Sequence, residues 1–240
     1  MSGGIYSALS GMQVRMDDLD RVASDLANVG TSGYKGDRLA VAAAERERFG
    51  RELDSAIDVM AGERRVDLRG GVIGTTGRDL DAAIEGDGFF VIQTPSGERY
   101  TRDGAFLRRG DGVLTTRDGN PVAGDKGEIH LTGNDTVKIA QDGTVREGER
   151  VAGRLKLVRF ESATDIERES GARFRAKPDV EPAATEARVI GGSLEAANVT
   201  VVDRMATIVE ISRAFEGLQR GISVLSNDID GRAISELGRR

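Results

Sequence analysis

Residues 86–119 are GDGFFVIQTPSGERYTRDGAFLRRGDGVLTTRDG, in which the dipeptide Asp-Gly occurs four times; a fifth follows at Asp142-Gly143. Asp-Gly between runs of strand-forming residues favours the tight turn of a β-hairpin. Such runs lie among these dipeptides: FFVIQ (89–93), ERYTR (98–102), VLTT (113–116), TVKIA (136–140) and RLKLVRF (154–160). We therefore predict a compact, mainly antiparallel β domain over residues 72–160.

The chain upstream of this domain begins with a helical pattern. Its apolar residues alternate at spacings of three and four, which keeps one helix face apolar at a 3.5-residue period, as in a coiled-coil seam. This N-terminal stripe consists of Ile5, Leu9, Met12, Met16, Leu19, Ala23 and Leu26. Gly30 and Gly33 are expected to stop the helix.

The C-terminal end of the chain repeats the pattern. Its stripe consists of Ile208, Ile211, Phe215, Leu218, Ile222, Leu225 and Ile229. Asn198 or Thr200 is expected to cap the start of this helix. One helix cannot bury such a stripe alone. The two stripes could pair with each other, bind neighbouring subunits, or lie on the β domain as ordinary packing.

The segments between the helices and the β domain are predicted to be connectors. The first, 34–71, contains AVAAAERERFGRELD (40–54), a possible short helix, and the second, 161–197, carries two prolines and many charges. The expected fold class is therefore α+β. Residues 1–33 and 198–240 would form one discontinuous helical assembly domain around the β domain.

The composition excludes several classes of function. The net charge of −6 is spread in mixed runs, which argues against a basic face for nucleic acid or a polybasic patch for membranes. No apolar run approaches the ~20 residues that a membrane-spanning helix needs. The first residues, MSGGIYSALSG, lack the pattern of a cleaved secretory signal. The absence of cysteine excludes disulfides and thiolate chemistry.

Candidate catalytic and binding motifs are weak. The single histidine, His130, has no cysteine or second histidine with which to build a zinc site or a triad. GGVIGTTG (70–77) and GNPVAGDK (119–126) lack the lysine of a phosphate-binding loop and are interpreted as turns. We therefore expect no catalytic residue, no metal and no cofactor.

Three separated stretches resemble the flagellar rod and hook protein family. The first is ALSGM (8–12) with LDRVASDLANVGTSGYK (19–35). The second comprises LDAAIEGDGFFVIQ (80–93), YTRDGAF (100–106) and GVLTTRDGNPV (112–122). The third is GGSLEAANVTVVDRMATIVEISRAFE (191–216). Two departures occur. Ser24 and Asp25 stand where the family pattern has two asparagines, and Arg78-Asp79-Leu80 lacks the proline that usually precedes the leucine.

The resemblance implies a structural subunit of the flagellar basal-body rod, the tubular drive shaft that transmits torque to the hook and encloses the export channel. It implies no enzymatic activity. The short chain favours a proximal rod subunit, with the distal rod protein as the alternative. The implied partners are other copies of the chain, neighbouring rod proteins and the flagellar type III export apparatus. That route would carry the subunit to the periplasm without a cleaved signal.

Two unrelated functions would require other features of the chain. A secreted enzyme acting on cell-wall glycan would need two carboxylates facing a cleft, roughly 5–10 Å apart. A ligand-binding β module would need a deep apolar pocket within residues 72–160. No sequence motif favours either alternative.

Overall fold

The computed structural model describes residues 2–40, 63–133, 135–185 and 187–237, with side chains described over residues 9–38, 65–133, 135–185 and 187–223. The chain is mainly β, with one helix at each end: α1 (Ser2–Ala27) and α3 (Val201–Leu237). The predicted β-rich centre between two terminal helices is confirmed. The possible short helix at 40–54 falls largely outside the described residues.

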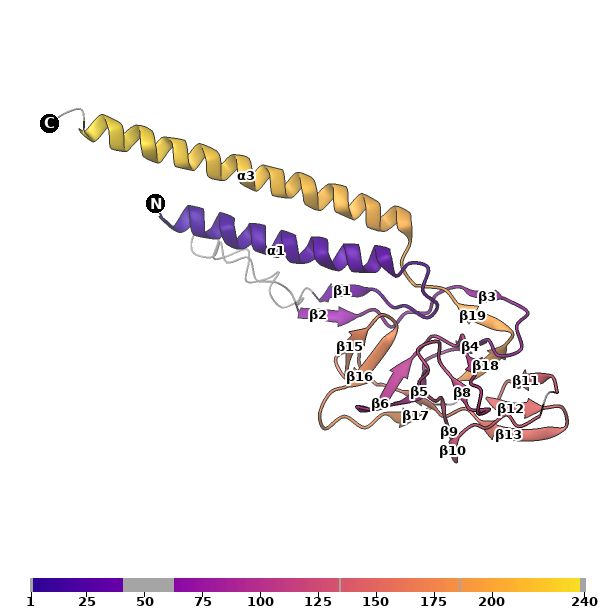
Figure 1. Cartoon of the computed structure of the whole chain (residues 1–240). Helices are drawn as coiled ribbons and strands as arrows, with labels where there is room; N and C mark the ends of the chain where they lie inside the picture. Colours follow the sequence, from indigo (N-terminus) through magenta and orange to yellow (C-terminus); the bar gives the residue numbers. More distant parts are fainter. Residues whose placement is uncertain (1, 41–62, 134, 186, 238–240) are drawn as a thin grey trace. The chain divides into compact units, whose positions relative to one another are not determined.

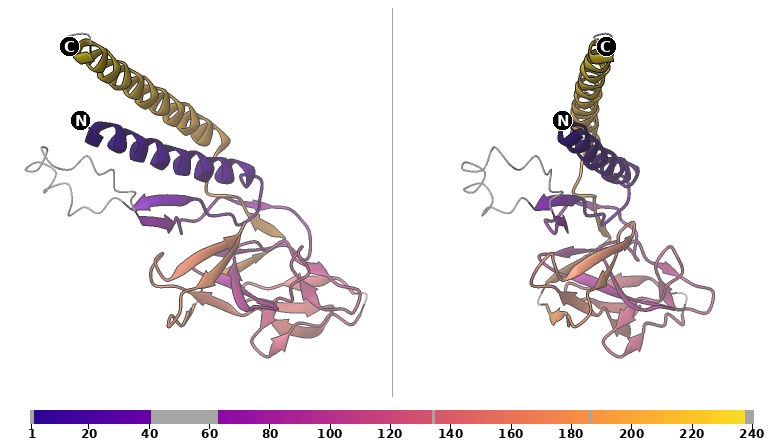
Figure 2. Two further views of the ribbon diagram at one scale, coloured as in Figure 1. Left: turned by 60° about the vertical axis from the view of Figure 1, so that its left-hand side comes forward. Right: turned by 90° about the vertical axis from the view of Figure 1, so that its left-hand side faces the viewer.

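Two compact units make up the chain. The helical unit comprises Met1–Leu26, Leu39–Arg64 and Val201–Arg240, and the β unit comprises Ala27–Arg38 and Arg65–Thr200. Within the helical unit, α1 and α3 run antiparallel and side by side (Figures 1 and 2). Neither described helix is long and apolar enough to cross a membrane.

The main sheet of the β unit has six strands in the order β15-β16-β6-β5-β14-β17, and all neighbours are antiparallel. Its strands are β5 (Phe89–Thr94), β6 (Gly97–Thr101), β14 (Leu157–Arg159), β15 (Ile166–Ser170), β16 (Arg173–Ala176) and β17 (Ala183–Ala184). The strands at its centre, β5 and β6, come from the stretch that dominates the sequence pattern.

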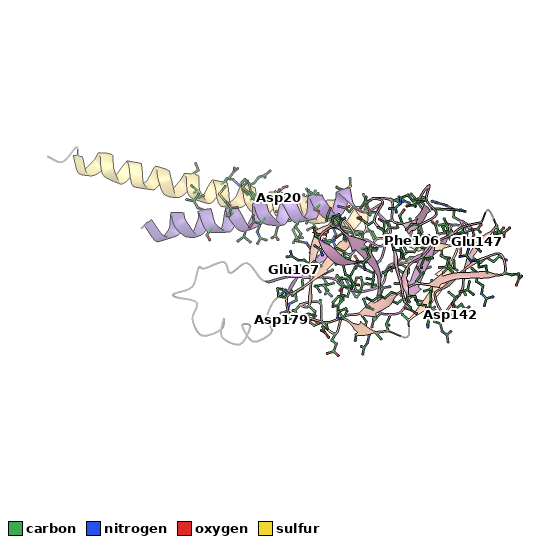
Figure 3. All side chains as sticks on the ribbon, turned by 60° about the horizontal axis from the view of Figure 1, so that its bottom comes forward. Asp20, Phe106, Asp142, Glu147, Glu167 and Asp179 are labelled. Atoms are coloured by element: carbon green, nitrogen blue, oxygen red, sulfur yellow. The ribbon has the colours of Figure 1, made fainter. Side chains whose placement is uncertain are left out.

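Strand β5 is buried on both faces and separates two apolar cores. Phe90 and Ile92 point into one core, and Phe89 and Val91 point into the other, as the two-residue period of a strand requires. Phe106 packs edge-on against Phe90 at 5.1 Å between ring centroids, inside the β unit (Figure 3). Aromatic side chains thus fill part of both cores that β5 separates.

The smaller sheets surround this core. One has three strands: β11 (Val137–Ile139), β12 (Thr144–Glu147) and β13 (Arg150–Arg154). The others are pairs: β1 (Asp37–Ala40) with β2 (Glu63–Val66), β3 (Ile73–Thr75) with β19 (Ser193–Glu195), β4 (Ala82–Glu85) with β18 (Arg188–Gly191), β7 (Leu107–Arg108) with β8 (Leu114–Thr115), and β9 (Ala123–Gly124) with β10 (Gly127–Glu128).

The Asp-Gly dipeptides have two roles in the β unit. Gly112 and Gly143 adopt positive φ in the turns of the β7–β8 and β11–β12 hairpins, as predicted. Gly104 does not turn a hairpin. The carbonyl oxygen of Ala82 lies where a Cβ would stand at Gly104, so this glycine permits close backbone packing.

Four sequence interpretations are wrong. Residues 161–197, expected to be an extended connector, contribute five strands, β15 to β19. GGVIGTTG (70–77), interpreted as a turn, contains the strand β3, and GNPVAGDK (119–126) contains β9. The helix α1 ends at Ala27, before the glycines that were expected to stop it.

Candidate assembly interface

Three chain segments of the β unit meet at what we call the root: residues 33–36, 67–71 and 195–198. Backbone hydrogen bonds join them. Gly33 N donates to Glu195 O at 2.7 Å, Asp67 N to Gly36 O at 2.8 Å, and Asn198 N to Tyr34 O at 3.1 Å. The first segment follows α1 in the chain and the last precedes α3. The root therefore fixes the two points from which the chain leaves the β unit toward its helices.

A buried ion cluster lies at the root. Lys35, Arg102 and Glu195 are each at most 3% exposed. One Glu195 carboxylate oxygen accepts a hydrogen bond from Lys35 Nζ, and the other accepts one from Arg102 Nη1 at 3.2 Å. Gly71 N also donates to this carboxylate, at 2.7 Å. One carboxylate thus links the N-terminal segment, the β strands and the C-terminal segment.

Backbone carbonyls complete the cluster, since it holds two cations and one anion. Lys35 Nζ donates to Arg69 O at 2.8 Å, and Arg102 donates to Ile84 O at 3.1 Å and Gly86 O at 2.6 Å. Burial lowers the pKa of Lys35, and the hydrogen bond and charge of Glu195 oppose that shift. Burial likewise lowers the pKa of Arg102. The cluster depends on Glu195, because that residue alone supplies the negative charge hydrogen-bonded to both cations.

Asn198 belongs to the root and does not cap α3, which leaves Thr200 of the two predicted cap residues. Its side-chain oxygen accepts a hydrogen bond from Gly36 N at 2.7 Å. Its amide nitrogen donates to Asp67 O at 2.8 Å and to Arg69 O at 3.1 Å. Since α3 begins at Val201, Thr200 occupies the cap position.

Arg168 holds the segment that follows α1. Its guanidinium lies 4.6 Å from the centroid of the Tyr34 ring and 5.3 Å from that of Phe174, within the range of cation–π attraction. It also donates to Asp37 at 2.8 Å and to the carbonyl of Lys35. Arg168 belongs to β15, within residues 161–197, for which the sequence predicts a connector.

The helix pair has its own contact face. A Cβ at Gly11 would lie 3.4 Å from Cδ1 of Leu218, so the two helices approach closely there. The carboxylate of Asp25, itself 1% exposed, lies 3.4 Å from Nη1 of Arg204. By helical spacing, Val22 lies on the same face of α1 as Gly11 and Asp25, and it too is buried. This face is different from the predicted apolar stripe of α1.

Comparison with known proteins agrees with the resemblance noted in the sequence. A family model described as the flagellar hook protein FlgE/F/G D1 domain matches residues 83–147. The flagellar basal-body rod protein FlgF of Caulobacter vibrioides is 32% identical, over 100% of this chain and 99% of the relative. This chain belongs to the flagellar basal-body rod protein FlgF family. The FlgF protein of Escherichia coli is also 32% identical, over 97% of both chains. FlgG of Bacillus subtilis is 28% identical over 90% of this chain.

In this FlgF-family chain, the N-terminal stripe is partly exposed. Leu9 and Met16 are 50% and 51% exposed, and Ala23 is exposed as well. Met12, Leu19 and Leu26 are half-buried. The side chain of Ile5 falls outside the described residues. The face of α1 toward α3 is the one with Gly11 and Asp25, so the stripe remains a predicted contact with other subunits.

The C-terminal stripe lies differently. Ile211 is 5% exposed, and Leu218 approaches Gly11 of α1. The half-buried members are Ile208, Phe215, Leu218 and Ile222. The side chains of Leu225 and Ile229 fall outside the description. In α3, therefore, the predicted stripe includes the side that meets α1 within the same chain.

One departure from the FlgF-family pattern now has a physical account. Asp25, which stands where the family pattern has asparagine, pairs with Arg204 across the two helices. The other departure leaves Arg78 at 3.8 Å from the buried carboxylate of Asp81, which also accepts a hydrogen bond from Thr76 Oγ1 at 2.7 Å.

Sequence reasoning missed the root, because its charged residues lie far apart in the chain. Lys35 and Glu195 are separated by 160 positions. The available signal was a charged residue inside each terminal stretch of the family pattern, in GYK (33–35) and in LEAAN (194–198). The weak candidates remain weak: His130 is exposed, with Glu128 at 3.9 Å. Among the described residues, no group of His, Cys, Asp or Glu could hold a metal ion.

Proposed function

We propose that this chain is a structural, non-catalytic subunit of the proximal flagellar rod, and that it polymerises with copies of itself and with neighbouring rod proteins. The observation that carries the proposal is the similarity to FlgF proteins over the whole chain, including both ends. In this rod the terminal helices would form the inner layer of a tubular drive shaft. The β unit would form the layer outside them.

The root supports this role. In a shaft that transmits torque, the helices and the β unit of each subunit must stay firmly connected. In this chain, both connections from the β unit to the helices pass through three hydrogen-bonded segments and one buried ion cluster. Buried hydrogen bonds to charged groups resist changes in the geometry of the segments that they join. We therefore propose that the root holds the two helix connections at a fixed spacing under load.

A test of the rod assignment uses a motile strain that lacks the gene for this chain, complemented with an epitope-tagged copy. Purified basal bodies should contain the tagged chain, and immunogold labels should mark the rod near the motor. Without the gene, the rod should end before its distal part and motility should be lost. Labels on the distal half of the rod would favour the distal alternative. Normal rods in the strain without the gene would refute a rod function.

We further propose that the N-terminal segment directs export through the flagellar type III apparatus to the periplasm. Deleting residues 2–30 should stop secretion while the protein accumulates in the cytoplasm. Residues 1–38 fused to a reporter should suffice for export, whereas the reporter alone should stay inside. Normal periplasmic amounts of the deleted chain, or export in a strain without the apparatus, would contradict this proposal.

A further inference from the structure

The Asp-Gly dipeptides of this chain allow a chemical reaction as well as tight turns. The main-chain nitrogen that follows an aspartate can attack the side-chain carboxyl carbon of that aspartate, and glycine hinders this attack least because it has no side chain. The hydroxyl group of the protonated carboxyl leaves as water, and a five-membered succinimide ring forms. Water then opens the ring at one of its two carbonyls. One product is aspartate again, and the other is isoaspartate, in which the main chain runs through the former side-chain carbonyl.

Three of these dipeptides have a carboxylate that is held in its charged form. Asp103, Asp111 and Asp142 each accept a hydrogen bond from the N–H group two residues further on, at 3.0 to 3.2 Å. Hydrogen bonds to a carboxylate favour its ionised state, which does not react. The guanidinium of Arg109 also binds Asp111 and lowers its pKa to about 2. Hydrogen bonds from Thr144 lower the pKa of Asp142.

Two further dipeptides are restrained through the main chain, which must rotate before the succinimide ring can close. The Asp87 carbonyl accepts a hydrogen bond from Thr185 Oγ1 at 2.8 Å. Gly88 is buried, and a Cβ there would lie 3.2 Å from Cγ2 of Thr185. Asp230-Gly231 lies within α3, so ring closure there requires the helical dihedral angles to be broken.

Asp118-Gly119 is the least restrained of the six dipeptides. The Asp118 side chain is 77% exposed, and the ion pair printed for it is a long one, with Arg173 Nη1 at 4.0 Å. Water screens such a pair. Gly119 adopts a φ of 81° in the turn between β8 and β9, and a Cβ there would meet no atom within 4 Å. Both reacting groups can therefore move without displacing a neighbour.

We propose that Asp118 is the principal site of spontaneous isoaspartate formation in this chain. The modification lengthens the main chain by one carbon atom inside a tight turn. That turn is closed by Gly119 N donating to Thr116 O at 3.0 Å and by Thr116 N donating to Asn120 O at 2.9 Å. Val122, which follows closely, is fully buried in the core. The modified chain should therefore unfold at a lower urea concentration than the fresh chain.

Peptide mapping by mass spectrometry tests the site on the purified full-length chain, aged in mildly acidic buffer below its unfolding temperature. We expect at least about tenfold more isoaspartate at Asp118 than at Asp111, because each unit of pKa changes the protonated fraction tenfold. A larger amount at Asp87, Asp142 or Asp230 than at Asp118 would overturn the proposal.

Two variants test the physical reason for this selectivity. Asp118→Glu keeps the charge at an exposed position but would need a six-membered ring, which closes much more slowly. It should remove the isoaspartate signal at this turn and the loss of stability on ageing. Arg109→Gln frees the Asp111 carboxylate from its guanidinium, so isoaspartate at Asp111 should rise by about tenfold for each unit that the pKa recovers. An unchanged amount at Asp111, in a variant with the circular-dichroism spectrum of the original chain, would show that carboxylate hydrogen bonds do not select the site.

Discussion

Glu195→Gln is expected to lower the free energy of unfolding of the β unit by about 3–5 kcal/mol, the usual cost of removing one partner from a buried ion pair. The substitution keeps the size of the side chain and removes the carboxylate charge that binds both Lys35 and Arg102. Two buried cations then lose the one carboxylate that is hydrogen-bonded to both of them. Urea unfolding of the purified chain, followed by near-ultraviolet circular dichroism, measures the change.

Glu167→Gln is the matched control for this variant. Glu167 also accepts a hydrogen bond from an arginine, Arg175 at 2.8 Å, but both side chains are about half exposed. Water screens that pair, so its loss should cost far less than the loss of the Glu195 charge. Equal midpoints for Glu195→Gln and the unmodified chain would show that the cluster does not stabilise the root.

Ile211→Asp is expected to separate α3 from α1 and to abolish incorporation into the rod. Ile211 is the most buried described side chain of α3. The substitution loses the ~1.5–3 kcal/mol gained by burying an isoleucine side chain and forces an unpaired carboxylate into an apolar contact. The helical signal of the monomer should fall, since helices in proteins depend on packing for their stability. The unfolding transition of the β unit should not change.

The outcome for the β unit decides between two interpretations of the helices. If Ile211→Asp also lowered the unfolding transition of the β unit, the helices would be ordinary packing elements of that domain. Gln219→Asp, one exposed position beyond Leu218 on the same helix, controls for added charge and should leave both the helical signal and assembly intact. Assembly measured in purified basal bodies completes the comparison.

The elements with local signals were predictable from the sequence. Asp111-Gly112 and Asp142-Gly143 predict the β7–β8 and β11–β12 hairpins, because the turn of a hairpin is formed by residues adjacent in the chain. The end helices follow from their apolar periodicity. Strands β15 and β16 did not stand out, since β16 is paired with β6, far away in the chain, and its alternating arginines resemble a solvated connector.

The candidate site was predictable only in part, for a similar reason. Apolar periodicity identified the stripes but not which face of each helix meets the other. In α1 that face contains Gly11 and Asp25, and neither has the apolar character that pattern analysis detects. The roles of Lys35, Arg102 and Glu195 depend on contacts between residues distant in the sequence. The sequence around a charged residue does not show whether that residue is buried in an ion pair or exposed to solvent.

The root also has a consequence for how such a chain can change in size. Residues 33–36 and 195–198 lie side by side, so the intervening polypeptide leaves and returns at nearly the same place. Domains whose ends are close together tolerate being inserted into, or enlarged within, another structure. Loops remote from the root, such as Gly148 between β12 and β13, could therefore accept extra modules without altering the spacing of the two helix connections. Subunits that share this architecture could in this way differ in the size of the β unit while the spacing of their helix connections stays the same.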